Sequence, residues 1–149
     1  MARPHILVLS PHAAVADGLV RLLTLEGRFE ARSATSLAEL ADPDSRWQAD
    51  VVLVDGSVLR NAEGTLPLPV PALLLAGTRE DADRYLARVP TAKGWLRKDP
   101  TYAELEQALV GAGAAPTPLS GARARLIALA IFGTILVLAA IAALWLAFN

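Results

Sequence analysis

The chain of 149 residues contains no cysteine. This absence excludes a disulfide scaffold, a cysteine nucleophile and a thiolate metal site. An excess of charge of one sign is also missing, because 14 basic and 15 acidic residues leave a net charge of −1. A nearly neutral chain offers no basic footprint for a nucleic acid. Charged residues make up 19% of the chain, against about 25% in an ordinary soluble domain.

The motifs of several enzyme classes are absent as well. The sequence has no glycine-rich phosphate loop, no set of serine, histidine and aspartate at catalytic spacing, and no run of metal ligands. We therefore expect a protein that is not an enzyme and that carries no resident cofactor or metal.

What the sequence has in excess is apolar residues, and the excess is local. Residues 126–148 form a block of 23 residues without a charge, in which Thr134 is the one hydroxyl side chain. As a helix this block would be about 35 Å long, enough to span a hydrocarbon core of about 30 Å. A buried core helix is the alternative, but a core helix of this length normally has a polar face. The block therefore predicts a transmembrane helix.

The residues that flank this block predict its orientation. Arg123 and Arg125 precede it, and no basic residue follows it. Because basic residues stay on the cytoplasmic side, we expect a single-pass protein of the inner membrane whose N-terminal domain is cytoplasmic. The two arginines would also contact anionic membrane lipid.

The part of the chain before the linker alternates short apolar runs with amphipathic stretches. Runs of strand type and stretches of helical spacing follow one another in turn. The predicted strands are residues 6–9, 29–33, 50–55, 70–76 and 94–97. The predicted helices are residues 14–25, 36–40, 79–89 and 101–109, with Ser36 and Thr101 as N-caps.

Strands that alternate with helices predict an α/β fold with a five-stranded, parallel, doubly wound sheet. The third crossover is short, because residues 56–71 contain three prolines and leave room for one or two helical turns, around residues 57–63. The predicted organisation is a domain at 1–111, a linker with basic juxtamembrane residues at 112–125 and a single transmembrane helix at 126–148.

The crevice of a doubly wound sheet lies at the carboxyl ends of its strands. Asp55 and Lys98 both come to this edge, and opposed charges at strand ends commonly pair. His12 could act as a base or metal ligand, but with no other histidine or cysteine near it in sequence it is better read as a turn residue. The residues that the strand ends bring to this crevice are Ser10, Pro11, His12, Asp55, Ala76, Gly77, Thr78 and Lys98.

Taken in order, these strand ends resemble the receiver domain of two-component response regulators, the CheY-like, flavodoxin-like fold, over roughly residues 4–111. The apolar run 51–54 that ends in Asp55 looks like the phospho-acceptor strand. Residues 94–99 (GWLRKD) look like the fifth strand of NarL/FixJ-type receivers. The resemblance implies that Lys98 is the functional lysine and that Trp95 is the switch aromatic, although Trp95 is also readily explained as a packing residue.

The sequence departs from the receiver pattern at the positions that carry its chemistry. The acidic pair that helps to hold Mg²⁺ is replaced by Ser10 and Pro11. The switch hydroxyl at the end of the fourth strand is replaced by Ala76, and Thr78 lies two residues further on, past the strand. Mg²⁺ prefers carboxylate oxygens, so Asp55 alone is a poor site. The resemblance is therefore to a degenerate receiver, or pseudo-receiver.

We expect a membrane-anchored pseudo-receiver that acts as a protein–protein interaction module in bacterial signal transduction. Its partner would be a histidine kinase or a membrane signalling protein, and a homodimer is a further candidate. The resemblance implies a surface formed by helix 79–89, strand 94–97 and the last helix, with Tyr85, Trp95 and Tyr102.

Two other functions compete with this one. The alternative is a phosphorylatable receiver of a phosphorelay, with Asp55 as phospho-acceptor and Mg²⁺ as cofactor. A DNA-binding regulator is disfavoured, because only the linker and the apolar block follow the last predicted helix.

Overall fold

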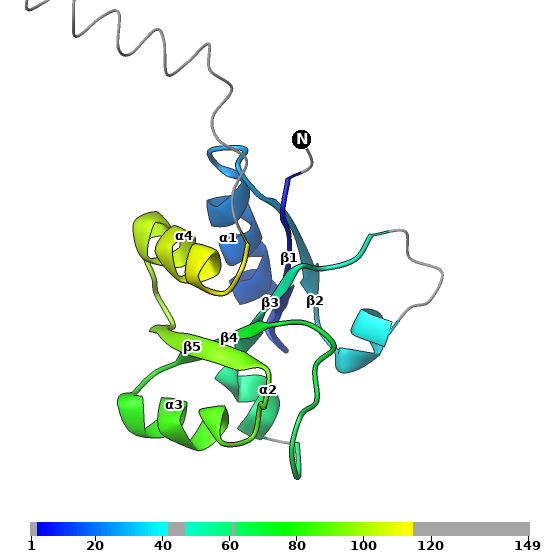
Figure 1. The fold of residues 1–149 in the computed structure, drawn as a ribbon, viewed down its shortest axis with the longest axis vertical. Coiled ribbons are helices and arrows are strands. Elements are labelled where there is room, and N and C mark those ends of the chain that lie inside the picture. Colours follow the sequence, from blue (N-terminus) through cyan, green and yellow to red (C-terminus); the bar gives the residue numbers. More distant parts are fainter. Residues whose placement is uncertain (1–2, 42–46, 61, 115–149) are drawn as a thin grey trace, which may run out of the picture. The chain divides into compact units, whose positions relative to one another are not determined.

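The computed structural model describes residues 3–41, 47–60 and 62–114. Most of the predicted linker and all of the predicted membrane helix, with Arg123 and Arg125, lie outside the described residues. No helix within the described ranges is both long enough and apolar enough to cross a membrane. The elements, shown in Figure 1, are β1 (His5–Leu9), α1 (Ala13–Thr24), β2 (Glu30–Ala34), the 3₁₀ helix η1 (Leu37–Ala41), β3 (Val51–Asp55), α2 (Gly56–Arg60), β4 (Ala72–Ala76), α3 (Arg79–Leu86), β5 (Ala92–Arg97) and α4 (Tyr102–Gly111).

The five strands form one parallel sheet in the order β2-β1-β3-β4-β5. The chain starts at β1, goes out to β2 at one edge, crosses back past β1 to β3 and continues to β5 at the other edge, as in a doubly wound fold. The register between β4 and β5 shifts by one residue, because Ala72 pairs with Ala92 and Leu73 with Gly94. The predicted five-stranded parallel α/β sheet is confirmed.

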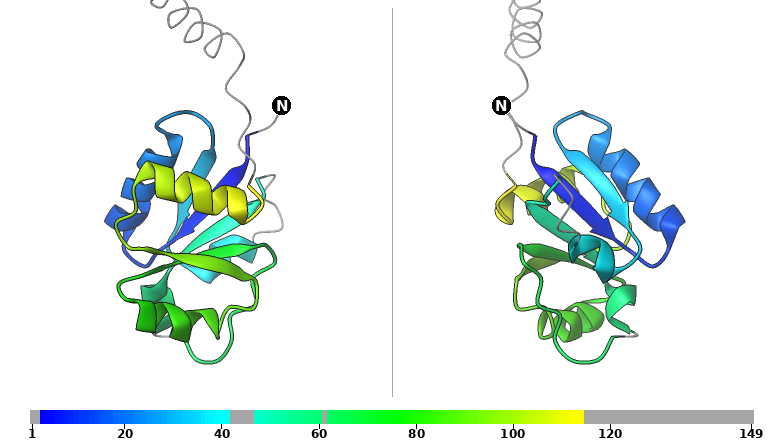
Figure 2. Two further views of the ribbon diagram at one scale, coloured as in Figure 1. Left: turned by 60° about the vertical axis from the view of Figure 1, so that its left-hand side comes forward. Right: turned by 90° about the vertical axis from the view of Figure 1, so that its right-hand side faces the viewer.

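Helices cover both faces of the sheet, with α1 and α4 on one face and α2 and α3 on the other (Figures 1 and 2). Successive side chains of a strand point to opposite faces. The core under α1 and α4 therefore contains Ile6, Val8, Val51, Leu53, Leu105 and Leu109. The core under α2 and α3 contains Leu7, Leu9, Val52, Val54, Leu74 and Val89. Because both faces are covered, β3 is buried at every position.

The helix predicted after Ser36 is present in the second crossover. It is the 3₁₀ helix η1 over Leu37–Ala41, and the described residues of this crossover contain no α-helix. The carboxylate of Glu39 accepts hydrogen bonds from the backbone and hydroxyl groups of Thr35 and Ser36, which ties up the first turn.

The third crossover is short, as predicted, and an extended segment closes it. Helix α2 ends at Arg60, and residues 66–71 run with alternating burial. Leu68 is buried and Leu66 and Val70 are half-buried, whereas Pro67 and Pro69 are exposed. A proline has no backbone N–H that needs a partner, so this segment covers the core without a helix or a ladder.

Arg88 fastens this crossover to the end of α3. Its Nε donates to the Gly64 carbonyl at 2.9 Å, and its Nη1 donates to the Leu59 carbonyl at 2.6 Å. Its Nη2 donates to the Ala62 carbonyl. In return, the Leu66 N–H donates to the Arg88 carbonyl at 2.7 Å. One side chain thus binds three carbonyls of a segment that has almost no secondary structure of its own.

Several predicted boundaries differ from the structure by a few residues. Helix α3 ends at Leu86, because Arg88 and Val89 already form tighter bonds, of the i→i+3 type, to Tyr85 and Leu86. Strand β4 starts at Ala72, later than the predicted residue 70. Strand β5 starts at Ala92, earlier than the predicted residue 94.

Candidate functional site

The candidate site lies at the carboxyl edge of the sheet, around Asp55 at the end of β3. The loop after β1 brings Ser10 to it, and the end of β5 brings Lys98. Asp55 is 2% exposed and Ser10 is fully buried. Apolar strands on both sides of β3 surround the carboxylate, so its charge must be satisfied by the protein itself.

Both oxygens of the Asp55 carboxylate accept hydrogen bonds. Oδ2 accepts from the Ser10 hydroxyl at 3.0 Å. Oδ1 accepts from the Ser57 backbone N–H at 3.0 Å and lies 3.0 Å from the Lys98 ammonium nitrogen. The Lys98 side chain is 42% exposed, so this ion pair connects a buried acid to the surface.

These contacts decide the charge of Asp55. Burial by itself raises the pKa of a carboxyl, because it disfavours the ionised form. Here the bonds from the Ser57 N–H, the Lys98 ammonium and the Ser10 hydroxyl outweigh burial and lower the pKa of Asp55 below its ordinary value. Asp55 is therefore an ionised carboxylate at neutral pH, with at least one donor at each oxygen.

Ser10 connects Asp55 to the start of α1. Its hydroxyl donates to Asp55 and also accepts the His12 backbone N–H at 3.2 Å. Its own N–H donates to the Ala34 carbonyl of β2 at 3.1 Å. His12 is exposed and is the N-cap residue of α1, but its side chain forms no capping bond, and Pro11 beside it is exposed. Ser10 thus contacts Asp55 directly. His12 is connected to Asp55 only through the bond from its backbone N–H to the Ser10 hydroxyl.

Among the described residues, no hydrogen bond joins a hydroxyl at the end of β4 to Asp55. Ala76 is fully buried and Gly77 is exposed. Thr78 is the N-cap of α3, and its hydroxyl accepts the Asp81 N–H at 3.2 Å. The Thr78 hydroxyl therefore satisfies a helix end.

Gly56 and Tyr85 form a contact beside Asp55 that the sequence did not reveal. A Cβ atom on Gly56 would lie 2.3 Å from Cε2 of Tyr85 and 2.9 Å from the Leu75 carbonyl oxygen. Helix α3 thus packs its tyrosine ring directly on the residue that follows Asp55. Only a glycine fits there, because a side chain would overlap both the ring and the backbone.

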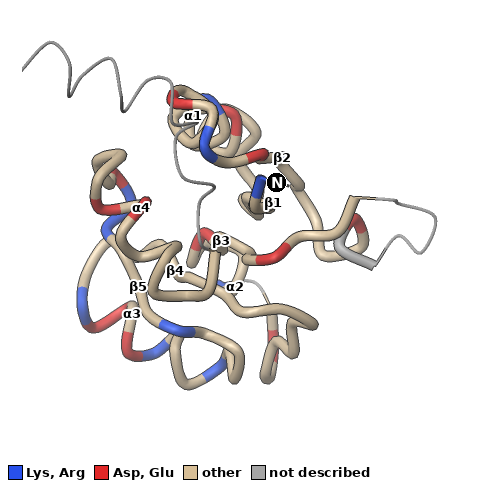
Figure 3. The backbone as a smooth tube through the Cα atoms, turned by 45° about the horizontal axis from the view of Figure 1, so that its top comes forward, with Lys and Arg blue, Asp and Glu red and all other residues tan. Residues whose placement is uncertain are grey.

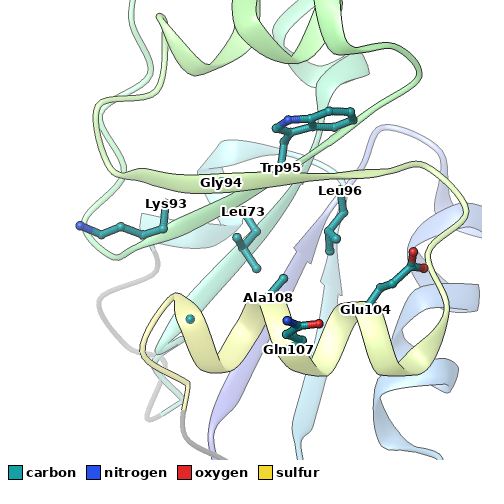
Figure 4. Close-up of a pocket in the computed structure, with 9 residues that line it drawn as sticks. Leu73, Lys93, Gly94, Trp95, Leu96, Glu104, Gln107 and Ala108 are labelled. Carbon is teal, nitrogen blue, oxygen red and sulfur yellow. The ribbon is translucent and has the colours of Figure 1, made fainter.

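The structure corrects the predicted interaction surface at Tyr85. Tyr85 is only 6% exposed, so it belongs to the core under α3 and not to the surface. Tyr102 is half-buried and packs against the opposite core. Trp95 is half-buried and points toward α3, whereas Leu96 points toward α4 (Figure 4). The reason is that α3 packs on β4 and β5 and against α2, so that Tyr85 and Trp95 face the core beneath it.

A groove of about 370 Å³ lies between β5 and α4, as Figure 4 shows. It exists because small residues face each other across it, namely Gly94 on β5 and Ala108 and Gly111 on α4. The residues that line it are Leu73, Lys93, Gly94, Trp95, Leu96, Glu104, Gln107, Ala108 and Gly111. The signal for this groove in the sequence is the small residues at the end of the last helix, Ala108 and Gly111. Helical periodicity alone does not distinguish such positions from ordinary surface positions.

Charge around the described elements is mixed. In the view of Figure 3, acidic and basic residues are interspersed along the chain and do not gather by sign. Within the described ranges, no group of three or more histidine, cysteine, aspartate or glutamate side chains is placed to hold a metal ion.

Comparison with known proteins places the fold. No family model matches the sequence, and no curated protein matches it. A CheY-like receiver domain from Methylobacillus flagellatus is 20% identical, with a TM-score of 0.54 over 73% of this chain and 98% of the other. A response regulator receiver protein from Burkholderia phymatum is 22% identical, with a TM-score of 0.57 over 78% of this chain and 100% of the other.

A third structure is the signal receiver domain of a response regulator from Mycobacterium tuberculosis described as NarL. It is 22% identical, with a TM-score of 0.52 over 74% of this chain and 95% of the other. Identities at this level establish the fold alone. The described part of the chain has the CheY-like receiver fold, as predicted from the sequence.

Proposed function

We propose that this protein is a pseudo-receiver, a protein–protein interaction module of bacterial signal transduction that is anchored in the inner membrane with its folded domain in the cytoplasm. The observation that supports this most directly is the state of Asp55, whose two oxygens are occupied by Ser10, Ser57 and Lys98 in a buried setting. In this proposal Asp55 and Lys98 form a structural ion pair, and the protein is not an enzyme.

The donor set around Asp55 does not suit Mg²⁺. This ion requires nearly octahedral coordination by hard oxygens and usually binds one or two carboxylates. Asp55 is the one carboxylate among the crevice residues, and its oxygens already accept bonds from a cation and two neutral donors. Pro11 has a hydrocarbon side chain, and the Ser10 hydroxyl is a neutral ligand at best. We therefore propose that the protein carries no cofactor.

Phosphoryl transfer to Asp55 meets the same obstacle. The attacking oxygen must approach the phosphorus in line, and the charge of the phosphoryl oxygens must be offset by cations. With 2% of Asp55 exposed, little of the residue is open to a phosphodonor. Lys98 is one cation beside the carboxylate, which keeps the phosphorylatable receiver as the second candidate.

The groove between β5 and α4 is the surface that we propose for partner binding. Its floor is apolar, and the exposed side chains of Lys93 and Glu104 stand at its rim. Protein interfaces combine an apolar centre with a polar rim in this way. The partner would be a histidine kinase, a membrane signalling protein or a second copy of this chain. Anchoring would raise the effective concentration of the folded domain toward such a partner at the membrane.

The decisive experiment measures phosphorylation of the full chain in detergent micelles. The protein is incubated with radiolabelled acetyl phosphate and Mg²⁺, and the Asp55→Ala variant and an authentic receiver serve as controls. We expect no stable label on the wild type and full labelling of the authentic receiver. Label on the wild type that is lost in Asp55→Ala would overturn the pseudo-receiver proposal in favour of the phosphorelay alternative.

A further inference from the structure

Three large apolar side chains are exposed among the described residues, and all three lie on one face of the domain. Val15 is 42% exposed, Leu25 is 77% exposed and Val110 is 46% exposed. Val15 lies on α1, Leu25 caps the end of α1, and Val110 lies near the end of α4. Both helices cover the same face of the sheet (Figures 1 and 2). Single exposed apolar residues are ordinary, but three on one pair of helices indicate an interaction surface.

One hydrogen bond shows which way α1 is turned. The Ser33 hydroxyl of β2 donates to the Asp17 carboxylate at 3.2 Å, so the Asp17 side of α1 faces β2. Leu22 is five residues after Asp17, which places it about 140° further round the helix. Val15 and Leu25 are seven residues before and three residues after Leu22, so they share its side of α1. This apolar side of α1 therefore points away from β2.

The same side of α1 has the spacing of a helix that packs on another helix. Val15, Gly18, Leu22 and Leu25 stand at i, i+3, i+7 and i+10, the spacing of positions a and d over two heptads. None of these four side chains is charged. A Cβ atom on Gly18 would meet nothing within 4 Å, so the space above this residue is open. A helix from outside the domain can therefore approach α1 closely at Gly18, with apolar side chains before and after it.

Helix α4 extends this surface on the side that faces α1. Arg28, in the loop after α1, forms an ion pair with Glu106 of α4. Val110 is four residues after Glu106 and lies on the same side of the helix. A helix that packs on α1 thus has Val110 beside it as a further apolar contact. This surface is separate from the groove described above, which lies between α4 and β5.

We propose that this surface is a dimer interface, which binds the same surface of a second copy of the chain with the two α1 helices parallel. A two-fold interface brings one patch of a protein against itself. Parallel helices with apolar a and d positions meet this condition, because each position contacts its own counterpart. The residues of the proposed interface are Val15, Gly18, Leu22, Leu25 and Val110.

The direction of α1 fits a pair of anchored chains. In this parallel fold, α1 and α4 both run from the carboxyl edge of the sheet to its amino edge, and Ala114 follows α4. Two domains with parallel α1 helices therefore have both Ala114 residues on the same side, from which both linkers can reach one membrane. This step alone rests on the proposed anchor. Anchoring would also raise the effective concentration of one copy toward the other.

The test is disulfide cross-linking of the full chain, which has no native cysteine. The purified protein is reconstituted into vesicles of phosphatidylethanolamine and phosphatidylglycerol. Gly18→Cys places a thiol in the interface, and the control Ala87→Cys places one at an exposed position at the end of α3, on the other face. A disulfide needs Cα atoms about 4.4–6.8 Å apart, so we expect mild oxidation to cross-link Gly18→Cys at least roughly tenfold more than Ala87→Cys.

Charge substitutions separate this interface from pairing through the membrane helix alone. In the Gly18→Cys chain, Val15→Lys together with Leu25→Lys should lower the cross-linked fraction by roughly tenfold, because like charges then face each other across the two-fold axis. The matched control Ala87→Lys should leave the cross-linked fraction unchanged. Circular dichroism verifies that each variant is folded. A Gly18→Cys chain that stays monomeric, or a cross-link that survives both lysines, would overturn the proposal.

Flotation of the same vesicles reports on the anchor separately. Protein that floats with the vesicles but does not cross-link at Gly18 would refute the dimer and keep the anchor, and lipid would then be the occupant of the surface. Protein that cross-links at Gly18 and is sensitive to the two lysines, but does not float, would refute the anchor and keep the dimer.

Discussion

Asp55 shows how much one buried side chain depends on its partners. Its position at the end of an apolar run predicted a place in the crevice, and the spacing to Lys98 suggested their pairing. The Ser57 N–H and the close packing of Tyr85 on Gly56 were not predictable, because neither follows from a side-chain pattern in the sequence. Backbone donors and ring contacts depend on the path of the chain after the strand.

The lowered pKa of Asp55 predicts how stability depends on pH. Since the folded pKa lies below the ordinary value of 3.8, ionised Asp55 stabilises the fold fully above that value and loses this contribution as the pH falls through the folded pKa. Urea unfolding of the full chain between about pH 6 and about pH 2.5 measures the slope. We expect Asp55→Asn to have a shallower loss than the wild type.

The control for this experiment is Asp99→Asn, which changes an exposed carboxyl next to Lys98. Its slope should match the wild type. A second variant, Lys98→Met, leaves Asp55 buried without its cation and should cost about 1–3 kcal/mol at neutral pH, discounted because Lys98 is partly exposed. Identical slopes in Asp55→Asn and the wild type would show that Asp55 does not carry this effect.

At the scale of elements, the starts of the helices were more predictable than their ends. Thr101 was predicted as an N-cap, and in the structure it forms a capping box with Glu104 at the start of α4. The helix predicted after Ser36 is also present, as a 3₁₀ helix, and Glu39 accepts hydrogen bonds from the backbone N–H groups of Thr35 and Ser36 at its start. A helix cap depends on residues that are neighbours in the sequence, whereas helix length depends on what the helix packs against.

Arg88 is the element-scale contact with the clearest prediction. Arg88→Lys keeps the charge but cannot direct three N–H groups at the Leu59, Ala62 and Gly64 carbonyls, so it should lower the free energy of unfolding by about 1–3 kcal/mol. Hydrogen exchange at residues 59–66 should quicken at the same time. The matched control is Arg84→Lys, whose exposed pairs with Glu80 and Asp81 contribute little. Equal effects of the two substitutions would refute the role of Arg88.

At the scale of the whole molecule, the described residues form a CheY-like receiver fold, and the apolar block 126–148 lies outside them. We predict that the full chain sediments with bacterial membranes and resists carbonate extraction, while a chain that ends at Ala114 stays in the supernatant. The physical reason is the transfer of 23 uncharged, mostly apolar residues into the hydrocarbon core. A full chain that remained in the supernatant would contradict the proposed anchor.

The cysteine-free sequence makes the orientation testable with one added thiol. Thr65→Cys places it at an exposed position of the third crossover. A membrane-impermeant maleimide should label this cysteine only after the inner membrane is permeabilised, as expected for a cytoplasmic domain behind Arg123 and Arg125. Labelling in intact spheroplasts would place the domain on the other side.

The sequence by itself determined the order of strands and helices, the parallel sheet, and the arrival of Asp55, Lys98 and Ser10 at one edge, because alternating patterns and strand ends depend on local order along the chain. The tertiary structure alone decided that both Asp55 oxygens are bonded, that Tyr85 lies in the core, and that His5 meets Trp47 and Glu30. These contacts join residues far apart in the sequence. Their geometry depends on how crossovers pack on the sheet, which no local pattern specifies.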